Sequence, residues 1–230
     1  MNVPEKTWTV ADVMVEDVET VRPGTPFKAM VEKLWVRGVS GLPVLDGEGN
    51  LVGIVSEVDL LSKQEHGGGA EVGRWVRHLS RLAAAEDSAA VEATLAELTK
   101  ARGRTAADVM TTPVVTIGPE ATIAEAATLM HKRDLKRLPV VDGRGRLVGI
   151  VSRADLLKTF LRADDSLASD VGVALRRVLG DPSAVTFTVE EAVVTLEGPV
   201  ASQQEAEAAV ARIEAIPGVV AVESSLQPAL

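Results

Sequence analysis

The feature that most constrains this chain is an internal repeat with an offset of 96 residues. Residues 42–61 read LPVLDGEGNLVGIVSEVDLL, and residues 138–157 read LPVVDGRGRLVGIVSRADLL. The segment Ala-Asp-Val-Met occurs at residues 11–14 and again at 107–110, at the same offset and without a gap. This period is too long for a solenoid repeat, so it indicates a duplicated supersecondary unit. Two copies imply a pseudo-twofold module.

Each copy follows the pattern strand, helix, strand, strand, helix, which predicts an α/β (α+β) unit of the form β-α-β-β-α. In the first copy, Thr25 is expected to cap the first helix and Pro26 to take its first position. In the second copy, residues 122–125 form a capping box that starts the equivalent helix. Helical spacing predicts apolar faces made of Phe27, Met30, Val31, Leu34 and Trp35 in the first helix and Ile123, Ala126, Ala127 and Met130 in the second.

Two short strands follow the first helix in each copy. In the first copy they cover residues 42–45 and 51–55, which are rich in β-branched residues and are joined by an Asp-Gly turn at 46–49. The second copy repeats this turn at the same offset. A final helix is then expected to start at Ser56 in the first copy and at Ser152 in the second.

The copies are predicted to occupy residues 8–61 and 106–160, with a connector at 62–105 between them. The connector has three consecutive glycines at residues 67–69 and then becomes helical in pattern, so we expect docked helices there. A separate small domain is expected over residues 164–230, where the sequence changes character again.

This tail is predicted to be a compact α-β-β-α-β domain. Its first helix is expected to end at Gly180, and its second helix to be capped by Ser202. Residues 185–189 alternate between apolar and polar side chains, and residues 192–196 are expected to form the returning strand. A third strand is predicted over residues 219–226, after a Pro-Gly turn.

Charge and composition exclude several classes of function. The chain has 24 Lys and Arg against 33 Asp and Glu, a net charge of −9, whereas nucleic-acid binding needs a clustered basic surface. The tail alone holds 3 basic and 11 acidic side chains over residues 164–230. Cysteine is absent, and the three histidines lack the spacing of a metal pair, so we expect no metal site. The sequence shows neither a signal peptide nor a membrane-spanning run, which favours a cytoplasmic location.

A hydroxyl and a carboxylate stand at the start of the last helix of each copy. Ser56 and Asp59 occupy this position in the first copy, and Ser152 and Asp155 in the second. The free N–H groups and the positive end of a helix attract phosphate, and a carboxylate can accept hydrogen bonds from vicinal ribose hydroxyls. The same spacing is also a capping box, which needs no ligand. One side chain can serve both roles.

The recurring LPVxD, LVGIVS and Ser-x-x-Asp-Leu-Leu segments resemble the CBS domain, and the resemblance covers residues 8–160 apart from the connector. Paired CBS domains form a module that binds adenosine-containing ligands, so the resemblance implies AMP, ADP, ATP or S-adenosylmethionine. It also implies that the serine contacts phosphate and that the aspartate contacts ribose. The tail resembles the BON domain through residues 195–200, the helix that follows Ser202, and residues 216–222.

The CBS resemblance further implies adenine contacts with two strand segments of each copy. These segments are Thr20, Val21, Leu42 and Pro43 in the first copy and Thr116, Ile117, Leu138 and Pro139 in the second. Without a ligand, such residues form ordinary strand core.

Basic side chains distinguish the second copy. The resemblance implies phosphate contacts for Lys136 and Arg137, and Arg153 lies beside the second helix start. The first copy has Ser40 and Gly41 in place of the basic pair. We therefore expect one of the two clefts to bind a phosphorylated adenosine ligand better, and the other to bind weakly or to prefer an uncharged adenosine moiety. Solvation of the surface by these basic side chains is the alternative.

The expected function is that of a non-enzymatic regulatory protein, in which ligand binding changes the packing of the two copies and is sensed by the tail or a partner protein. The resemblance implies a homodimer, with candidate faces at Phe27, Met30 and Trp35. The alternative is a surface-attachment or protein-interaction protein with a purely structural CBS pair, whose tail contacts phospholipid, although its acidic charge disfavours anionic headgroups. An enzyme would need an acid, a base and a nucleophile together, and no such motif occurs, so we assign no catalytic residue.

Overall fold

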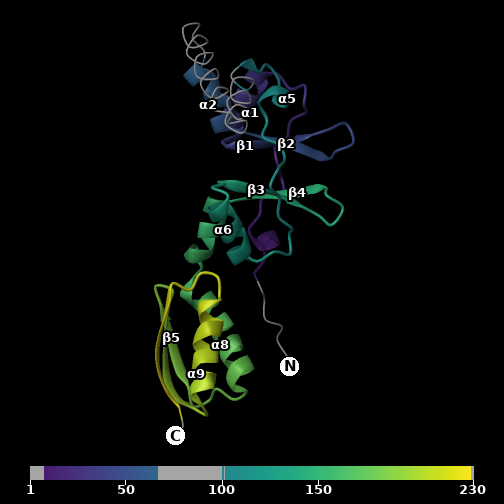
Figure 1. Ribbon diagram of the computed structural model, residues 1–230. Helices are drawn as coiled ribbons and strands as arrows, with labels where there is room; N and C mark the ends of the chain where they lie inside the picture. The colour runs from purple at the N-terminus through teal and green to yellow at the C-terminus, as the bar shows by residue number, and fades with distance from the viewer. Residues whose placement is uncertain (1–7, 67–99, 101, 229–230) are drawn as a thin grey trace, which may run out of the picture. The chain divides into compact units, whose positions relative to one another are not determined.

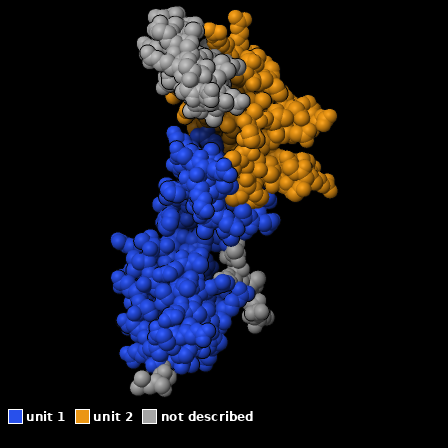
Figure 2. Space-filling view, viewed as in Figure 1, with its two compact units in different colours: residues 1–14, 119–138, 151–230 blue, residues 15–118, 139–150 orange. Residues whose placement is uncertain are grey.

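The computed structural model describes residues 8–66, 100 and 102–228, which belong to two compact units (Figure 2). Unit 1 consists of residues 1–14, 119–138 and 151–230, and unit 2 of residues 15–118 and 139–150. The second copy of the repeat is therefore divided between the units. Helices and β-sheets occur in both units, which confirms the α+β class (Figure 1).

Unit 2 contains the first copy of the repeat from residue 15 onward. Its elements are α1 (Phe27–Arg37), β1 (Gly41–Leu45), β2 (Leu51–Ser56), α2 (Glu57–His66) and α5 (Ala106–Val109). β1 and β2 form an antiparallel pair in which Gly41 lies opposite Ser56. The core of this unit is formed by Val21, Met30, Leu34, Leu42, Val44, Val55, Leu60, Ala106 and Val109. The register places the start of α2 beside the start of β1.

The leading strand expected in each copy is reduced to one parallel bridge, Val21 with Val44 and Ile117 with Val140. The N–H of Val21 donates to Pro43 at 3.0 Å, and its carbonyl accepts from Leu45 at 2.9 Å. Ile117 makes the equivalent bonds with Pro139 and Val141. In both copies a proline follows two residues later, and because it has no backbone N–H it cannot continue the pairing.

The first helix buries a narrower face than its sequence predicted. The N-cap of α1 is Pro26, while the Thr25 hydroxyl accepts a hydrogen bond from the N–H of Arg22 at 3.0 Å, so the predicted threonine cap is wrong. Met30 is fully buried, whereas Trp35 is 87% exposed. Val31 is also exposed. The sheet beside α1 has only two strands, and Trp35 lies on a face of the helix that the described elements leave exposed.

The second copy supplies α6 (Ile123–Lys132), β3 (Arg137–Val141), β4 (Leu147–Ser152), α7 (Arg153–Leu157) and the 3-10 helix η2 (Lys158–Leu161). β3 and β4 form the second two-stranded sheet. The predicted capping box of α6 is confirmed, with the N–H of Glu125 donating to the Thr122 hydroxyl at 3.2 Å. Ala126 and Met130 are buried as predicted, whereas Ala127 is exposed.

The tail has the predicted α-β-β-α-β order. It consists of α8 (Asp164–Leu179), β5 (Thr186–Glu190), β6 (Val193–Val200), α9 (Gln203–Glu214) and β7 (Ala221–Pro228). Strand β6 lies between an antiparallel β5 and a parallel β7, and the two helices pack on this sheet (Figure 1). The Ser202 cap and the end of α8 at Gly180 are confirmed. The last strand lies two residues later than predicted, because its residues 221–228 pair with all eight residues of β6.

Two predictions concern helices outside these domains. The predicted connector helices fall largely on residues 67–99, which lie outside the described residues. In the described ranges, no helix has both the length and the hydropathy required to cross a bilayer.

Candidate functional site

Ser56 and Asp59 form a closed hydrogen-bonded group at the start of α2. The backbone N–H of Ser56 donates to Asp59 Oδ2 at 2.8 Å, and its hydroxyl donates to the same oxygen at 2.7 Å. The other carboxylate oxygen, Oδ1, accepts from the Lys100 ammonium at 2.5 Å and from the Thr111 hydroxyl at 2.9 Å. Asp59 therefore completes the capping group and also holds Lys100 of the connector and Thr111 of the second copy.

Ser152 and Asp155 repeat this arrangement at the start of α7. The backbone N–H and the hydroxyl of Ser152 donate to Asp155 Oδ2 at 2.9 and 2.6 Å, and the N–H of Asp155 donates back to the Ser152 hydroxyl at 3.3 Å. Lys158, one turn further along, donates to Oδ1 at 2.7 Å. Asp155 is only 7% exposed, which is unusual for a carboxylate. The capping role expected from the spacing is thus confirmed at this helix start.

Both aspartates are held in the ionised state. Burial opposes ionisation of Asp59, but its hydrogen bonds from Lys100 and Ser56 outweigh burial and lower the pKa of the carboxyl group. Burial also opposes ionisation of Asp155, but the hydrogen bonds from Lys158 and Ser152 outweigh it and lower the pKa of this carboxyl group. A depressed pKa means that the carboxylates stabilise the fold above their ordinary pKa of 3.8 and lose this effect as the pH falls through the lowered value.

The lowered pKa values predict binding that does not depend on pH near neutrality. An uncharged ligand that donates hydrogen bonds to these carboxylates, for which adenosine is the probe, is expected to change its affinity by less than about twofold between about pH 8 and pH 5, because the carboxylates stay ionised over this range. Isothermal titration calorimetry across the range checks this expectation. Binding that weakens tenfold by pH 5 would contradict it, because that requires a carboxyl group with a raised pKa.

The basic pair of the second copy lies beside the start of α7. The carbonyl of Lys136 accepts a hydrogen bond from the N–H of Arg153 at 3.0 Å, so β3 begins next to the helix start. In the first copy, the carbonyl of Ser40 accepts from the N–H of Glu57 at 3.4 Å in the equivalent place. The Arg153 side chain donates to the Leu135 carbonyl and to Asp134. The backbones of Lys136 and Arg153 are therefore hydrogen-bonded to each other at the start of α7.

The strand residues predicted to contact adenine have core side chains. Leu42 and Leu138 are 0% exposed, and Val21 and Ile117 are also buried. Backbone bonds bring Val21 to Pro43 and Ile117 to Pro139. Thr20 and Thr116, which precede Val21 and Ile117, are half-buried. Any ligand contact from the two leucines would have to come from the backbone.

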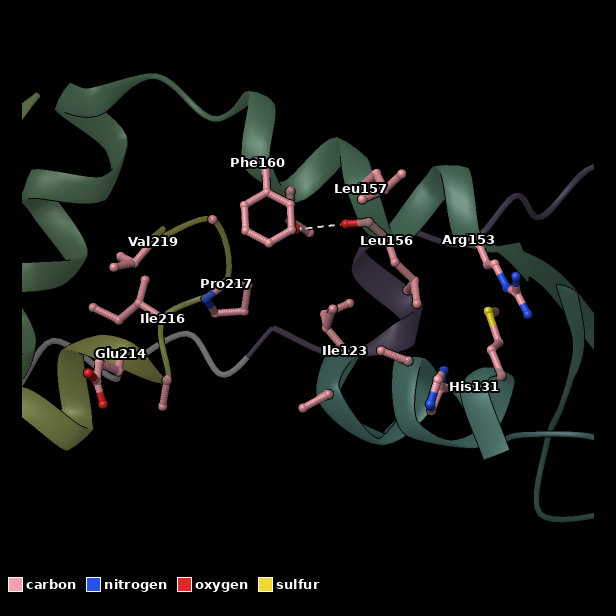
Figure 3. Close-up of a pocket in the computed structure, with 16 residues that line it drawn as sticks. Ile123, His131, Arg153, Leu156, Leu157, Phe160, Glu214, Ile216, Pro217 and Val219 are labelled. Carbon is pink, nitrogen blue, oxygen red and sulfur yellow. Dashed lines mark hydrogen bonds between the residues drawn. The ribbon is translucent and has the colours of Figure 1, made fainter. Parts of the chain in front are cut away.

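A separate hollow of about 580 Å³ lies within unit 1, between the helices of the second copy and the tail (Figure 3). Ile123 and Phe160 face this hollow from one side, and Ile216 and Pro217 face it from the tail (Figure 3). Neither Ser152 nor Asp155 lines it. Arg153 is the one residue of this helix start that lines the hollow, whose walls are largely apolar but also include His131 and Glu214 (Figure 3).

Two residues at the first helix start were not found by sequence reasoning. Lys100 lies 41 positions from Asp59, inside the connector, and Thr111 lies 52 positions away. At the repeat offset their counterparts are Pro4 and Val15, so the internal alignment gave no signal for either donor. Among the described residues, no group of three or more His, Asp or Glu side chains could hold a metal ion.

The fold defines a protein that consists of a repeat module and an appended domain. The module contains two α+β units with a serine and an aspartate at matching helix starts, and a small α+β domain follows it. A CBS domain model matches residues 10–66 and 106–162, and a BON domain model matches residues 163–227. The chain therefore belongs to the CBS domain proteins, with a tandem CBS pair followed by a C-terminal BON domain.

Known relatives match mainly through the CBS pair. The chain is 30% identical over 159 residues to the chloroplastic CBS domain-containing protein CBSX1 of Arabidopsis thaliana and 31% identical over 169 residues to CBSX2 of the same plant. These alignments cover 67% and 70% of this chain and 65% and 68% of the relatives. The crystal structure of CBSX2 in complex with AMP matches with a TM-score of 0.53 at 28% identity, over 67% of this chain and 97% of that chain.

Proposed function

We propose that this protein is a non-enzymatic sensor that binds an adenosine-containing ligand at its CBS pair and transmits the bound state to the BON domain or to a partner protein. The proposed ligand is AMP, ADP, ATP or S-adenosylmethionine. The observation that carries the proposal is the buried, ionised Asp155 beside Ser152 at a helix start, with Lys136 and Arg153 next to it in the backbone. In this proposal, Asp155 accepts a hydrogen bond from the ribose, and the basic side chains of Lys136 and Arg153 donate to phosphate.

The similarity to CBSX2, whose structure contains AMP, supports an adenosine ligand. We propose contacts with the helix-start residues, the basic residues and the strand residues. These are Thr20, Val21, Leu42, Pro43, Ser56 and Asp59 in the first copy and Thr116, Ile117, Lys136, Arg137, Leu138, Pro139, Ser152, Arg153 and Asp155 in the second. Burial of the leucine side chains supports backbone contacts at these two positions.

A direct route to the BON domain within unit 1 supports the proposed transmission. The helix start at Ser152 leads through α7 and η2 to Arg162. The Arg162 guanidinium then donates to the carbonyl of Pro217, in the turn between α9 and β7, at 2.9 Å. A ligand that shifts α7 would therefore move a segment bonded to the BON domain.

Other parts of the expected function stay predictions. A homodimer through α1 would use the exposed Trp35 and Val31, whereas Met30 is fully buried, so its proposed place in the contact face is wrong. Contacts of the BON domain with protein or lipid, the cytoplasmic location, the absence of catalysis, and the division at residues 8–61, 62–105, 106–160 and 164–230 also stay predictions.

A thermal-shift experiment tests the sensor. At a ligand concentration of about 100 times Kd, binding to the native state adds about 2.7 kcal/mol, so at least one of AMP, ADP, ATP or S-adenosylmethionine is expected to raise Tm by about 5 °C or more. Asp155→Asn is expected to abolish this rise, because the amide presents only one acceptor oxygen to the ribose. The exposed Asp165→Asn serves as a matched control that retains it.

Each variant is compared with its own ligand-free Tm, so a change in intrinsic stability does not affect the result. If none of the four compounds shifts the wild-type protein, the sensor proposal fails. A rise that persists unchanged in Asp155→Asn would remove Asp155 from the site.

A further inference from the structure

The carboxylate of Asp59 has no acceptor position left for a ligand. An ionised carboxylate offers about four lone-pair positions, two on each oxygen. Ser56 fills both positions on Oδ2 through its N–H and hydroxyl, at 2.8 and 2.7 Å. Lys100 and Thr111 fill those on Oδ1, at 2.5 and 2.9 Å. A ribose hydroxyl can therefore bind Asp59 only by displacing one of these donors.

The second copy differs at this point. Ser152 fills Oδ2 of Asp155 in the same way, but Oδ1 accepts from a single donor in the described part of the chain, Lys158 at 2.7 Å. Lys158 is an exposed neighbour three residues along the chain, with 65% of its side chain accessible. Among the residues that the structure describes, none fills the remaining acceptor position on Asp155, and Lys158 beside it can rotate into solvent.

Lys100 holds its position more firmly than Lys158. Its side chain is 25% exposed, its partner carboxylate is 10% exposed, and the ammonium also donates to the Thr111 hydroxyl at 2.9 Å. Hydrogen bonds between charged groups are about twice as strong as neutral ones, and a partly buried pair is screened less than one in water. A neutral ribose hydroxyl would replace an ammonium here, which is an unfavourable exchange.

We propose that Lys100 determines ligand selectivity between the two copies, by occupying on Asp59 the position that a ribose hydroxyl would take. This inference rests on the proposed adenosine function and adds to it the residue that closes the first copy. The Lys100 ammonium occupies the acceptor of the first copy, whereas the described residues leave one acceptor position of Asp155 unfilled in the second copy. The first copy binds adenosine ligands about tenfold to a hundredfold more weakly than the second, the factor that corresponds to one hydrogen bond to a charged group.

Calorimetric titration with AMP, and separately with adenosine, tests this on the full chain. Wild type is expected to show one high-affinity site per chain, which Asp155→Asn removes, and a second site at least tenfold weaker. Lys100→Met is expected to show two high-affinity sites, and the added site is expected to disappear in the Lys100→Met/Asp59→Asn double variant. Lys100→Arg, which retains a cation near Asp59, is expected to keep one high-affinity site.

Two controls keep the result interpretable. Lys33→Met removes another lysine of the same unit that pairs with a carboxylate, Glu19 at 2.6 Å, and is expected to leave one high-affinity site. In Lys100→Met the Asp59 carboxylate retains its donors from Ser56 and Thr111, and circular dichroism verifies the fold. Lys100→Gln replaces Lys100→Met should the methionine variant not fold.

The outcomes separate the two proposals. One high-affinity site in both wild type and Lys100→Met overturns the role of Lys100 but leaves the sensor intact. Two equal sites in wild type also overturn it. Absence of binding heat in wild type and in Lys100→Met overturns the sensor proposal together with this inference.

Discussion

Replacing Arg162 with alanine is expected to lower the free energy of unfolding of unit 1 by about 3 kcal/mol, near the lower end of the range for breaking a buried ion pair. The Arg162 side chain is 9% exposed and donates to Asp170 Oδ2 at 2.6 Å, to the Ser166 hydroxyl at 2.9 Å and to the Pro217 carbonyl at 2.9 Å. Its guanidinium also lies 4.7 Å from the centre of the Trp8 ring. The variant would leave Asp170, 30% exposed, without this cation.

Urea denaturation followed by fluorescence measures the effect, because Trp8 contacts the guanidinium directly. Arg162→Lys keeps the charge but not the planar group of donors, so it is expected to recover less than half of the loss. In an Arg162→Ala/Asp170→Ala double-mutant cycle, a coupling energy below about 0.5 kcal/mol would contradict the assigned ion pair.

The same variant separates ligand binding from transmission. Arg162→Ala leaves the helix start at Ser152 intact, so ligand affinity is expected to change less than about threefold, a small effect on the scale of one hydrogen bond. Hydrogen exchange in α9 and β7 is expected to stop responding to ligand, because the bond to Pro217 is lost. A ligand response in the BON domain that persists in the variant would show that transmission takes another route.

Substitution of Gly218 with alanine is expected to lower the free energy of unfolding by about 2 to 4 kcal/mol. Gly218 has a φ of +102°, a conformation that costs an L-residue about 1 to 3 kcal/mol. An added Cβ would also lie 2.5 Å from the Thr159 carbonyl oxygen and 3.3 Å from Leu167 Cδ2. A backbone oxygen cannot rotate away as a side chain can, so the tail would have to move off η2.

Gly143→Ala is the matched control for this substitution. Gly143 lies in the turn of the second copy, its φ is not positive, and an added Cβ would contact nothing within 4 Å. It is expected to change the free energy of unfolding by less than about 0.5 kcal/mol, as is usual for surface positions. Equal losses from the two alanine variants in urea denaturation would show that the Gly218 turn does not rest on η2.

Sequence periodicity identified most of the architecture, and it was least accurate where burial depends on neighbouring elements. The repeat and the order of most elements were predictable from the sequence. The caps at Thr122, Ser152 and Ser202 were also predictable, because each cap is made within four residues along the chain. The apolar face of α1 was overestimated at Trp35, since spacing along a helix does not reveal which of its faces other elements cover.

The candidate site shows the same division at the level of single contacts. The pairing of Asp59 with Ser56 follows from their spacing, and so does the equivalent pair of the second copy. The Lys100 donor to Asp59 does not, because it comes from 41 residues away in a segment that is not repeated.

The sequence by itself determined that this protein has two copies of one α+β unit, a third domain of its own, and a serine with an aspartate at two matching helix starts. These features are local or repetitive, so hydrophobic spacing and capping chemistry specify them. Only the tertiary structure decided that the described residues fill every acceptor position of Asp59 but not of Asp155, and that Arg162 bonds to a turn 55 residues later. Such contacts depend on how distant segments pack together, which no periodicity along the chain records.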